Sequence, residues 1–175
     1  MRKALYFLGI LNDADIDWLV TAGNRREVGA GVNLIDEGKP LDSIFLVIDG
    51  SFSVRSAAVG GKQIALLMSG EVMGEMSFVD AAMPSATVQA VERSFVLSIP
   101  RRRLNAKLAE DNGFAARFYR ALSMFLADRL RNTVASAGSG KPPGGHDDEL
   151  HGDAMDNIGM AGARFDWIQR RLQSA

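Results

Sequence analysis

The feature that most constrains the fold is a series of short apolar runs, separated by turn residues, between Asn24 and Pro100. The runs include VNLI, SIFLVI, SFSVRSAAV, KQIALLM and SFVLSIP, and the residues between them include DEGKP, DG, GG and SG. Strand-length runs at this spacing are typical of an all-β sandwich or barrel. Gly60 and Gly61 lie between two such runs and predict a hairpin turn. The segment GEMSFVDAA, which begins at Gly74, has little β character and predicts a short helix between strands.

A helical segment precedes the strands. Residues 1–22 have a helical pattern, in which Asn12 or Asp13 can cap a helix that ends before Gly23. The expected apolar face of this helix carries Ile16, Leu19 and Val20. The chain starts with a basic tip and a short apolar run, but aspartates interrupt that run early and no small-residue cleavage site follows. We therefore interpret the segment as part of the folded domain and not as a signal peptide.

Two further helices are expected after the strands. The first begins at Pro100, which suits a first helical turn, and ends near Asn112. The second covers residues 114–134 and has two apolar stripes. One stripe comprises Phe114, Phe118, Ala121 and Phe125, and the other comprises Tyr119, Leu122, Leu126, Leu130 and Thr133. Because a helix with one neighbour needs only one apolar stripe, we expect one stripe to pack on the β domain and the other to form a homodimer with a second copy.

The C-terminal part is expected to be a linker followed by a helix. The Gly, Ser and Pro residues of ASAGSGKPPGGHDD predict a flexible linker over residues 135–154, after a domain that covers residues 1–134. Residues 155–175 then form an amphipathic helix with Phe165, Ile168 and Leu172 on one side. This helix either folds back onto the first helix near Trp18 or binds an unidentified protein partner through residues 165–172. The sequence leaves both alternatives open.

Composition excludes several classes of function. The formal net charge is -1, so no basic field attracts nucleic acid, and the C-terminal part has no basic recognition helix. There is no cysteine, and no apolar run approaches the length of a membrane span. His146 and His151 lie in GGHDDELH, where a solvated acidic tail is favoured over a metal site. No Ser-His-Asp arrangement, P-loop or H-E-x-x-H is visible. We therefore expect a cytoplasmic protein that is not an enzyme, with no catalytic residues, metal, cofactor, membrane contact or direct nucleic-acid contact.

The order of these elements resembles the cyclic-nucleotide-binding domain family, which includes catabolite-activator-type regulators and the regulatory subunits of cyclic-AMP-dependent kinase. The resemblance extends from about Leu8 to Val134. IDEGKPLDSIFLVIDGSFSV resembles the family's first hairpins, with Gly38 and Gly50 at the turn positions. The resemblance implies an α+β fold, in which an antiparallel, jelly-roll-like β-roll is flanked by N-terminal helices and a long C-terminal helix.

The family's phosphate-binding cassette reads approximately G-E-x-[AS]-[LF], a variable spacer, and then R-[ST]-A-[TS]-V. Two segments of this chain match it: Gly74, Glu75, Met76, Ser77 and Phe78 correspond to the first half, and Ser85, Ala86, Thr87 and Val88 to the second. The resemblance implies that Glu75 accepts a hydrogen bond from a ribose 2′-hydroxyl. It also implies that Gly74 and nearby backbone N–H groups line the cyclic phosphate, since a helix N-terminus suits an anion.

The chain departs from the family at the residue before SATV, which is a phosphate-binding Arg in the family and Pro84 here. Loss of one partner from such a charge pair typically costs about 2–5 kcal/mol, which weakens binding roughly 30- to several-thousand-fold. Proline also removes a backbone donor. Two explanations remain open. The hydroxyls of Ser85 and Thr87 could hold an altered ligand together with backbone amides, or Glu75 and Ser77 could simply stabilise the short helix.

Several other residues have alternative interpretations. The resemblance places Thr133 at about the position of a residue that contacts the base in the family, but a surface threonine at a helix end is the favoured interpretation. Arg55 or Arg93 could replace the missing cation from elsewhere in the fold. The run of arginines at residues 101–103 is either a phosphate contact or a solvated face. Four methionines surround the cassette and form either core or a soft pocket wall: Met68, Met73, Met76 and Met83.

Two functions follow from these expectations. The first is a non-catalytic sensor in which a cyclic nucleotide such as cyclic AMP or cyclic GMP binds weakly or in an altered way and shifts the long helix. The second is a ligand-independent interaction scaffold with the same fold. A hollow polar cavity between Glu75 and Thr87 would favour the sensor. A site filled by Met76, Met83 or Pro84 would favour the scaffold.

Overall fold

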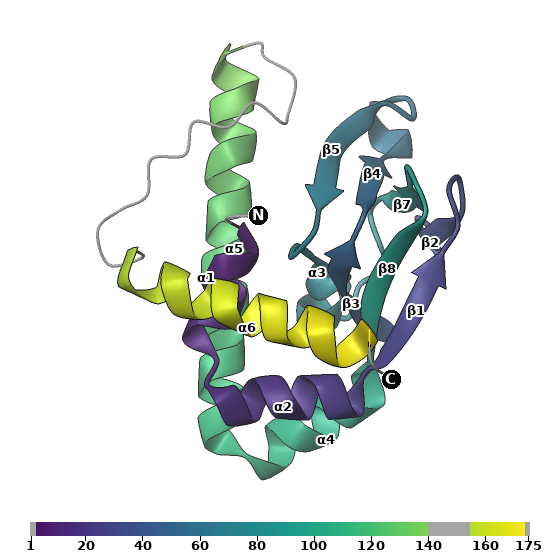
Figure 1. Cartoon of the computed structure of the whole chain (residues 1–175). Coiled ribbons are helices and arrows are strands. Elements are labelled where there is room, and N and C mark those ends of the chain that lie inside the picture. Colours follow the sequence, from purple (N-terminus) through teal and green to yellow (C-terminus); the bar gives the residue numbers. More distant parts are fainter. Residues whose placement is uncertain (1–2, 140–154, 174–175) are drawn as a thin grey trace.

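The computed structural model describes residues 3–139 and 155–173 (Figure 1). Two helices come first, α1 (Lys3–Ile10) and α2 (Asp13–Ala22). The strands follow as β1 (Asn24–Val28), β2 (Asn33–Ile35), β3 (Ser43–Asp49), β4 (Ser51–Arg55), β5 (Gln63–Met68), β6 (Val72–Met73), β7 (Thr87–Ala90) and β8 (Ser94–Pro100). A 3-10 turn, η1 (Ala57–Val59), separates β4 from β5, and α3 (Glu75–Asp80) separates β6 from β7. The remaining helices are α4 (Arg101–Glu110), α5 (Asn112–Ser139) and α6 (Met155–Gln173).

The strands form two four-stranded antiparallel sheets, with the orders β1-β8-β3-β6 and β2-β7-β4-β5. All eight strands contribute residues to a common interior: Val28, Leu34, Ile35, Phe45, Val47, Phe52, Leu67, Met73, Val88, Ala90 and Val96. The strand β3 reads as a continuous apolar run because both of its faces are buried. Phe45 and Val47 face this interior, whereas Ile44, Leu46 and Ile48 face the helices. The predicted α+β fold with a β-roll is confirmed, as are the β4–β5 hairpin and the short helix α3.

The helices pack against the outer face of the sheet β1-β8-β3-β6. Their core is aromatic at its centre, where the ring of Phe118 in α5 lies 5.5 Å from Phe7, 5.6 Å from Phe114 and 6.0 Å from Phe78. Figure 1 shows α5 standing beside the β-roll, with α6 lying across α1 and next to α2. Since Phe78 belongs to α3, this core connects the cassette helix directly to α5.

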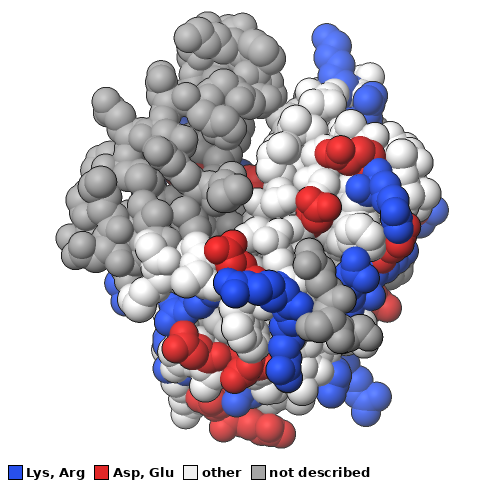
Figure 2. Space-filling model, in the orientation of Figure 1, with Lys and Arg blue, Asp and Glu red and all other residues white. Residues whose placement is uncertain are grey.

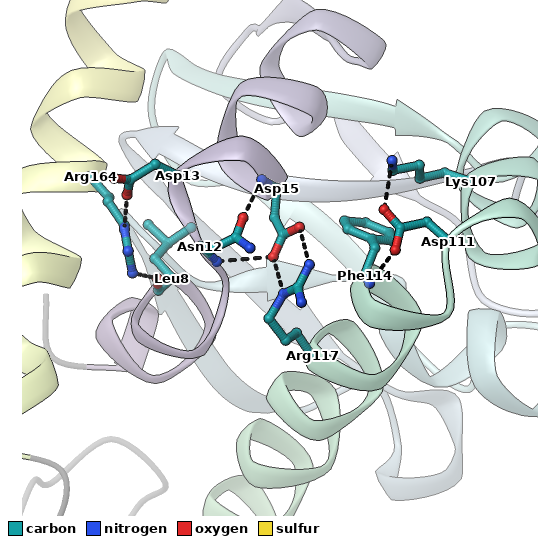
Figure 3. Close-up of polar contacts among 9 residues, drawn as sticks. All are labelled: Leu8, Asn12, Asp13, Asp15, Lys107, Asp111, Phe114, Arg117 and Arg164. Carbon is teal, nitrogen blue, oxygen red and sulfur yellow. Dashed lines mark hydrogen bonds and ion pairs between the residues drawn. The ribbon is translucent and has the colours of Figure 1, made fainter.

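The junction of α1 and α2 is held by a capping box and an ion pair (Figure 3). The side chain of Asn12 accepts a hydrogen bond from the Asp15 backbone N–H, and Asp15 accepts one from the Asn12 backbone N–H, both at 2.9 Å. Asp15 also pairs with Arg117 of α5. Of the two caps that the sequence allows, Asn12 is therefore the one observed.

The two apolar stripes of α5 have different surroundings. The first stripe is buried along its whole length, from Phe114 to Phe125. In the second stripe only Leu122 is buried, and Tyr119 and Leu130 are 46% and 64% exposed. The helix continues to Ser139, five residues into the stretch that we expected to be a linker. The rest of that stretch, with His146 and His151, lies outside the described residues.

The C-terminal helix α6 folds back onto α1 and α2, which is the first of the two alternatives for this segment. Its inner face is buried through Ala161, Phe165, Ile168 and Leu172. Polar contacts fix its position: Arg164 donates to the Leu8 carbonyl at 2.9 Å and to Asp13 at 2.8 Å, as Figure 3 shows. Gln169 donates to the carbonyl of Ile48, at the end of β3, at 2.8 Å.

Candidate functional site

The cassette begins where β6 turns into α3, at Gly74. This residue has a φ of 83°, in the left-handed region that favours glycine. A Cβ at this position would lie 2.8 Å from the Leu41 side chain and 3.1 Å from the Ser43 carbonyl oxygen. The backbone therefore requires glycine for two reasons, its conformation and the close approach of the loop before β3. This geometry turns the first residues of α3 into the body of the domain, where Glu75 and Ser77 are buried.

Glu75 forms an ion pair with Arg129 of α5. Its side chain is only 2% exposed, whereas that of Arg129 is 33% exposed. The same guanidinium donates to the Val72 carbonyl at 3.3 Å and lies 4.7 Å from the centre of the Phe125 ring. Burial raises the pKa of the Glu75 carboxyl above its ordinary value of 4.5, and the charge of Arg129 offsets this effect only in part.

Arg129 is not among the site residues predicted from the sequence. The available signal was its position: it follows Phe125 by four residues and so continues the apolar stripe that faces the domain. A cation on the buried face of a helix usually has a carboxylate partner. That partner could not be named from the sequence, because it depends on how α5 passes over α3.

The second half of the cassette is held by the loops around it. Pro84 is buried, and its carbonyl accepts a hydrogen bond from the Gly38 N–H at 2.8 Å. The Ser85 side chain is exposed, and its carbonyl accepts a hydrogen bond from Ser56 at 3.0 Å. Thr87 and Ala86 are half-buried, and the Thr87 hydroxyl accepts a hydrogen bond from the Glu37 N–H at 3.1 Å. The carbonyls of Pro84 and Ser85 and the Thr87 hydroxyl thus bond to the β2–β3 loop and to Ser56, the residue before η1.

The other candidate cations have different surroundings. Arg93 forms two hydrogen bonds to Glu27 of β1, at 2.6 and 3.0 Å. Arg55 is exposed at the end of β4, where it pairs in register with Thr87. Two of the arginines at residues 101–103 bond to backbone carbonyls in earlier segments: Arg101 bonds to Leu41 at 3.1 Å, and Arg103 to Ala22 at 2.9 Å.

Two further groups of candidates can be placed. Thr133 is exposed, and its hydroxyl donates to the Arg129 carbonyl, one turn earlier in α5, at 2.9 Å. Met76 and Met83 are 50% and 57% exposed, so neither side chain fills the site. Met73 is buried in the β-roll interior, whereas Met68 is 45% exposed on β5.

Features that would indicate other kinds of site are sparse in the described part of the chain. A cavity of about 10 Å³ lies between the helices and the sheet, but its lining is apolar and its volume is that of about one water molecule. No group of three or more His, Asp or Glu side chains among the described residues could hold a metal ion. Within the same residues, no helix combines the length and apolar character needed to cross a membrane.

Figure 2 shows positive and negative side chains interspersed over the visible face, which agrees with the net charge of -1.

Comparisons with known proteins identify the domain family. Residues 25–111 match the model of the cyclic nucleotide-binding domain. The chain is 29% identical over 112 residues to the Pycsar effector protein XpPycTIR of Xanthomonas perforans, which covers 63% of this chain and 36% of that protein. It is 29% identical over 103 residues to the cyclic AMP receptor protein of Thermus thermophilus, which covers 58% of this chain and 47% of that protein. The chain thus spans less than half the length of either relative.

A solved structure has the same fold. The cyclic nucleotide-binding domain from Methylobacillus flagellatus superposes with a TM-score of 0.68 at 22% identity, over 75% of this chain and 78% of that one. The matched residues contain both sheets, the cassette and α4. Residues 25–111 therefore form a domain of the cyclic nucleotide-binding family, with the β-roll fold.

Proposed function

We propose that this chain is a non-catalytic, cytoplasmic sensor module, in which a cyclic nucleotide such as cyclic AMP or cyclic GMP binds at the cassette with altered or reduced affinity. The observation that carries the proposal is the geometry of the first half of the cassette. Gly74 has the left-handed backbone that this turn requires, and Glu75 is buried directly after it. A buried carboxylate is costly to keep, so its presence at this position is consistent with a binding role.

The chemistry of the site is compatible with a nucleotide that is held mainly by its sugar. In the proposed complex, Glu75 accepts a hydrogen bond from a ribose hydroxyl, and the backbone N–H groups around Gly74 approach the phosphate. Pro84 does not supply the guanidinium that pairs with the phosphate in the family, and it has no backbone N–H to donate. Because a charge-assisted phosphate contact is missing, we expect wild-type affinity to be lower by about 2–5 kcal/mol than in family members with the cassette arginine.

Isothermal titration calorimetry tests the proposal with cyclic AMP, cyclic GMP and cyclic dinucleotides. The wild-type chain is compared with Pro84→Arg, which restores the cassette arginine. Val91→Arg is the matched control, because it adds the same charge at a 53% exposed position outside the cassette. We expect saturable binding that is roughly 30-fold or more tighter for Pro84→Arg than for wild type, and unchanged for Val91→Arg. Absence of binding by the folded wild type and by Pro84→Arg would overturn the proposal.

A second function, the ligand-independent scaffold, is favoured by specific contacts. Arg129 already pairs with Glu75, and Gly38 already bonds to the Pro84 carbonyl. Both halves of the cassette therefore have internal partners without a ligand. If the chain is a ligand-independent scaffold, the calorimetric experiment should give no binding heat with any nucleotide, for wild type or for Pro84→Arg.

We also propose that the chain forms a homodimer through α5. The exposed part of the second stripe, which includes Tyr119 and Leu130, presents apolar surface that the described residues of this chain leave open to solvent. A second copy of α5 offers the same stripe, and such self-complementary surfaces are typical of two-fold dimers. A further protein partner that binds the apolar face of residues 165–172 would have to displace α6 from its own chain, because Phe165, Ile168 and Leu172 are buried there.

A further inference from the structure

Arg129 lies where α5 leaves the body of the domain. Towards the N-terminus from this point, Phe118, Leu122 and Phe125 of α5 are buried. Towards the C-terminus, the described side chains Leu130, Arg131, Thr133 and Val134 are all exposed. The contacts of Arg129 therefore decide how firmly the distal part of α5, residues 130–139, is held against the β-roll.

The guanidinium of Arg129 joins three elements. It pairs with Glu75 at the start of α3, bonds to the carbonyl of Val72 in β6, and lies over the ring of Phe125 on its own helix. The strand β6 and the helix α3 are the two segments on either side of Gly74. Arg129 thus contacts the cassette on both sides of its turn.

The same carboxylate cannot serve Arg129 and a ligand equally well. Glu75 is 2% exposed, and its Oε1 accepts a hydrogen bond from Arg129. In the ligand-free state Arg129 bonds to Oε1 of this carboxylate, and the side chain is almost fully covered, so a ribose hydroxyl can reach it only if the groups packed around it, Arg129 among them, move. Since a ligand can shift an equilibrium only by binding one state better than the other, this competition gives the two states of the site different affinities.

We propose that Arg129 sets the ligand affinity of the cassette: its guanidinium holds Glu75 in the ligand-free state, and a ligand hydroxyl that takes this carboxylate releases the distal part of α5 from α3. The inference rests on the proposed sensor function and names the contact through which the site is coupled to α5. If the Arg129–Glu75 pair must open before the ligand binds, the apparent affinity is the intrinsic affinity multiplied by the fraction of molecules in which the pair is open. Arg129 is thus a positioning residue for Glu75 and not a contact to the phosphate.

Hydrogen–deuterium exchange of the full-length chain tests the hold on α5 without any ligand. We compare wild type with Arg129→Gln, Glu75→Gln and the double variant, and follow peptides from α3 and from α5 beyond residue 126. Arg131→Gln is the matched control, because it removes an exposed arginine two residues along the same helix. Both single variants are expected to increase exchange in both segments, and the double variant to add little beyond them. Unchanged exchange in the single variants would overturn the proposal that the Arg129–Glu75 pair fixes this part of α5. An increase in the double variant equal to the sum of the two single increases would overturn it as well.

Calorimetry with cyclic AMP and cyclic GMP tests the effect on affinity, in a Pro84→Arg background that supplies the missing phosphate partner. Adding Arg129→Gln is expected to tighten binding roughly 5- to 150-fold, the usual range of a coupling between two sites. If that variant fails to fold, Arg129→Lys keeps a charge and is expected to give a smaller gain. Unchanged or weaker binding would overturn the proposal, and weaker binding would assign Arg129 as a ligand contact. If Pro84→Arg itself binds no nucleotide, the proposed sensor function is wrong, and so is the proposed effect of Arg129 on affinity. The exchange experiment still tests whether the Arg129–Glu75 pair fixes α5 against α3.

Discussion

Asp15 of α2 and Arg117 of α5 form a two-point ion pair, in which Arg117 Nε lies 2.6 Å from Asp15 Oδ2 and Nη2 lies 2.8 Å from Oδ1 (Figure 3). The Asp15 side chain is 4% exposed, whereas that of Arg117 is 34% exposed. This pair connects the N-terminal helices to α5 across 102 residues of sequence. Because the same carboxylate completes the capping box with Asn12, one side chain both starts α2 and fixes its position on α5.

The variant Asp15→Asn is expected to be less stable than wild type by about 1.5–3 kcal/mol at neutral pH, the usual worth of a hydrogen bond to a charged group. Burial raises the pKa of Asp15, but the bonds from Arg117 and from the Asn12 N–H outweigh it, so the pKa lies below its ordinary value of 3.8. The stabilisation is therefore present above that value and is lost as pH falls through the lowered pKa.

Urea unfolding of wild type and Asp15→Asn over a range of pH measures this difference. Asp17→Asn is the control, because Asp17 is exposed on the same helix. The difference in the free energy of unfolding between wild type and Asp15→Asn should become smaller only at the acid end of the pH range. A gap that is constant with pH would contradict the assigned role of the charge.

A second prediction concerns the burial of Glu75. Replacing its partner by Arg129→Met leaves a carboxylate that is 2% exposed without this cation, which should cost about 3–5 kcal/mol at neutral pH. The pKa of Glu75 is already raised by burial, and loss of the Arg129 charge raises it further. The folded variant therefore favours the protonated carboxyl, and its stability should fall as pH rises from 4.5 through the raised pKa.

Chemical unfolding of Arg129→Met at mildly acidic and mildly alkaline pH provides the measurement. Arg131→Met removes the same charge at an exposed position of α5 and should change stability little at either pH. If Arg129→Met were destabilised equally at both pH values, the buried carboxylate would not be the cause.

Much of the fold could be predicted because the signals for it are local. The alternation of apolar runs and turn residues marked the strands, GEMSFVDAA marked α3, and Asn12 marked the start of α2. The expected end of the long helix at residue 134 was too early, because α5 runs on to Ser139. The additional residues, ASAGS, include two alanines, and alanine has the highest helix propensity.

The candidate site could be predicted only in part, for a physical reason. Gly74 and Glu75 were predicted as cassette residues because the local motif GEMSF resembles that of the family. The partners of the cassette come from segments that are distant in sequence: Arg129 from α5, Glu37 and Gly38 from the β2–β3 loop. Such contacts are fixed by tertiary packing, which the periodicity of a single segment does not encode.

The turn at Gly74 gives a third prediction. Gly74→Ala should cost more stability than Gly38→Ala, although both glycines have positive φ, 83° and 73°. A Cβ at Gly38 meets no atom within 4 Å, so its cost is backbone strain of about 1–2 kcal/mol. At Gly74 the Cβ would also lie 2.8 Å from Leu41, which adds an overpacking cost of about 1–3 kcal/mol. Thermal and urea unfolding measure both variants, and equal costs would contradict the close approach.

The docking of α6 gives a fourth prediction. Ile168 is fully buried in the helical core, so Ile168→Ala should destabilise the chain by about 2–5 kcal/mol. Met160→Ala is the control, because Met160 is 53% exposed on the same helix and its truncation should have little effect. Urea unfolding compares the two variants. Equal, small effects would indicate that α6 is detached in solution and available to a partner.

The exposed stripe of α5 gives the last prediction. If α5 forms a homodimer, Leu130→Glu places two carboxylates in an apolar interface and should dissociate it, because buried charges without partners are strongly unfavourable. Met124→Glu is the control, since Met124 is 40% exposed and lies outside the stripe that contains Tyr119 and Leu130. Sedimentation equilibrium should give twice the chain mass for wild type and Met124→Glu and the single chain mass for Leu130→Glu. A wild-type chain that is monomeric at high concentration would show that α5 does not mediate dimerisation, whereas a Leu130→Glu variant that stays dimeric would assign the interface to another surface.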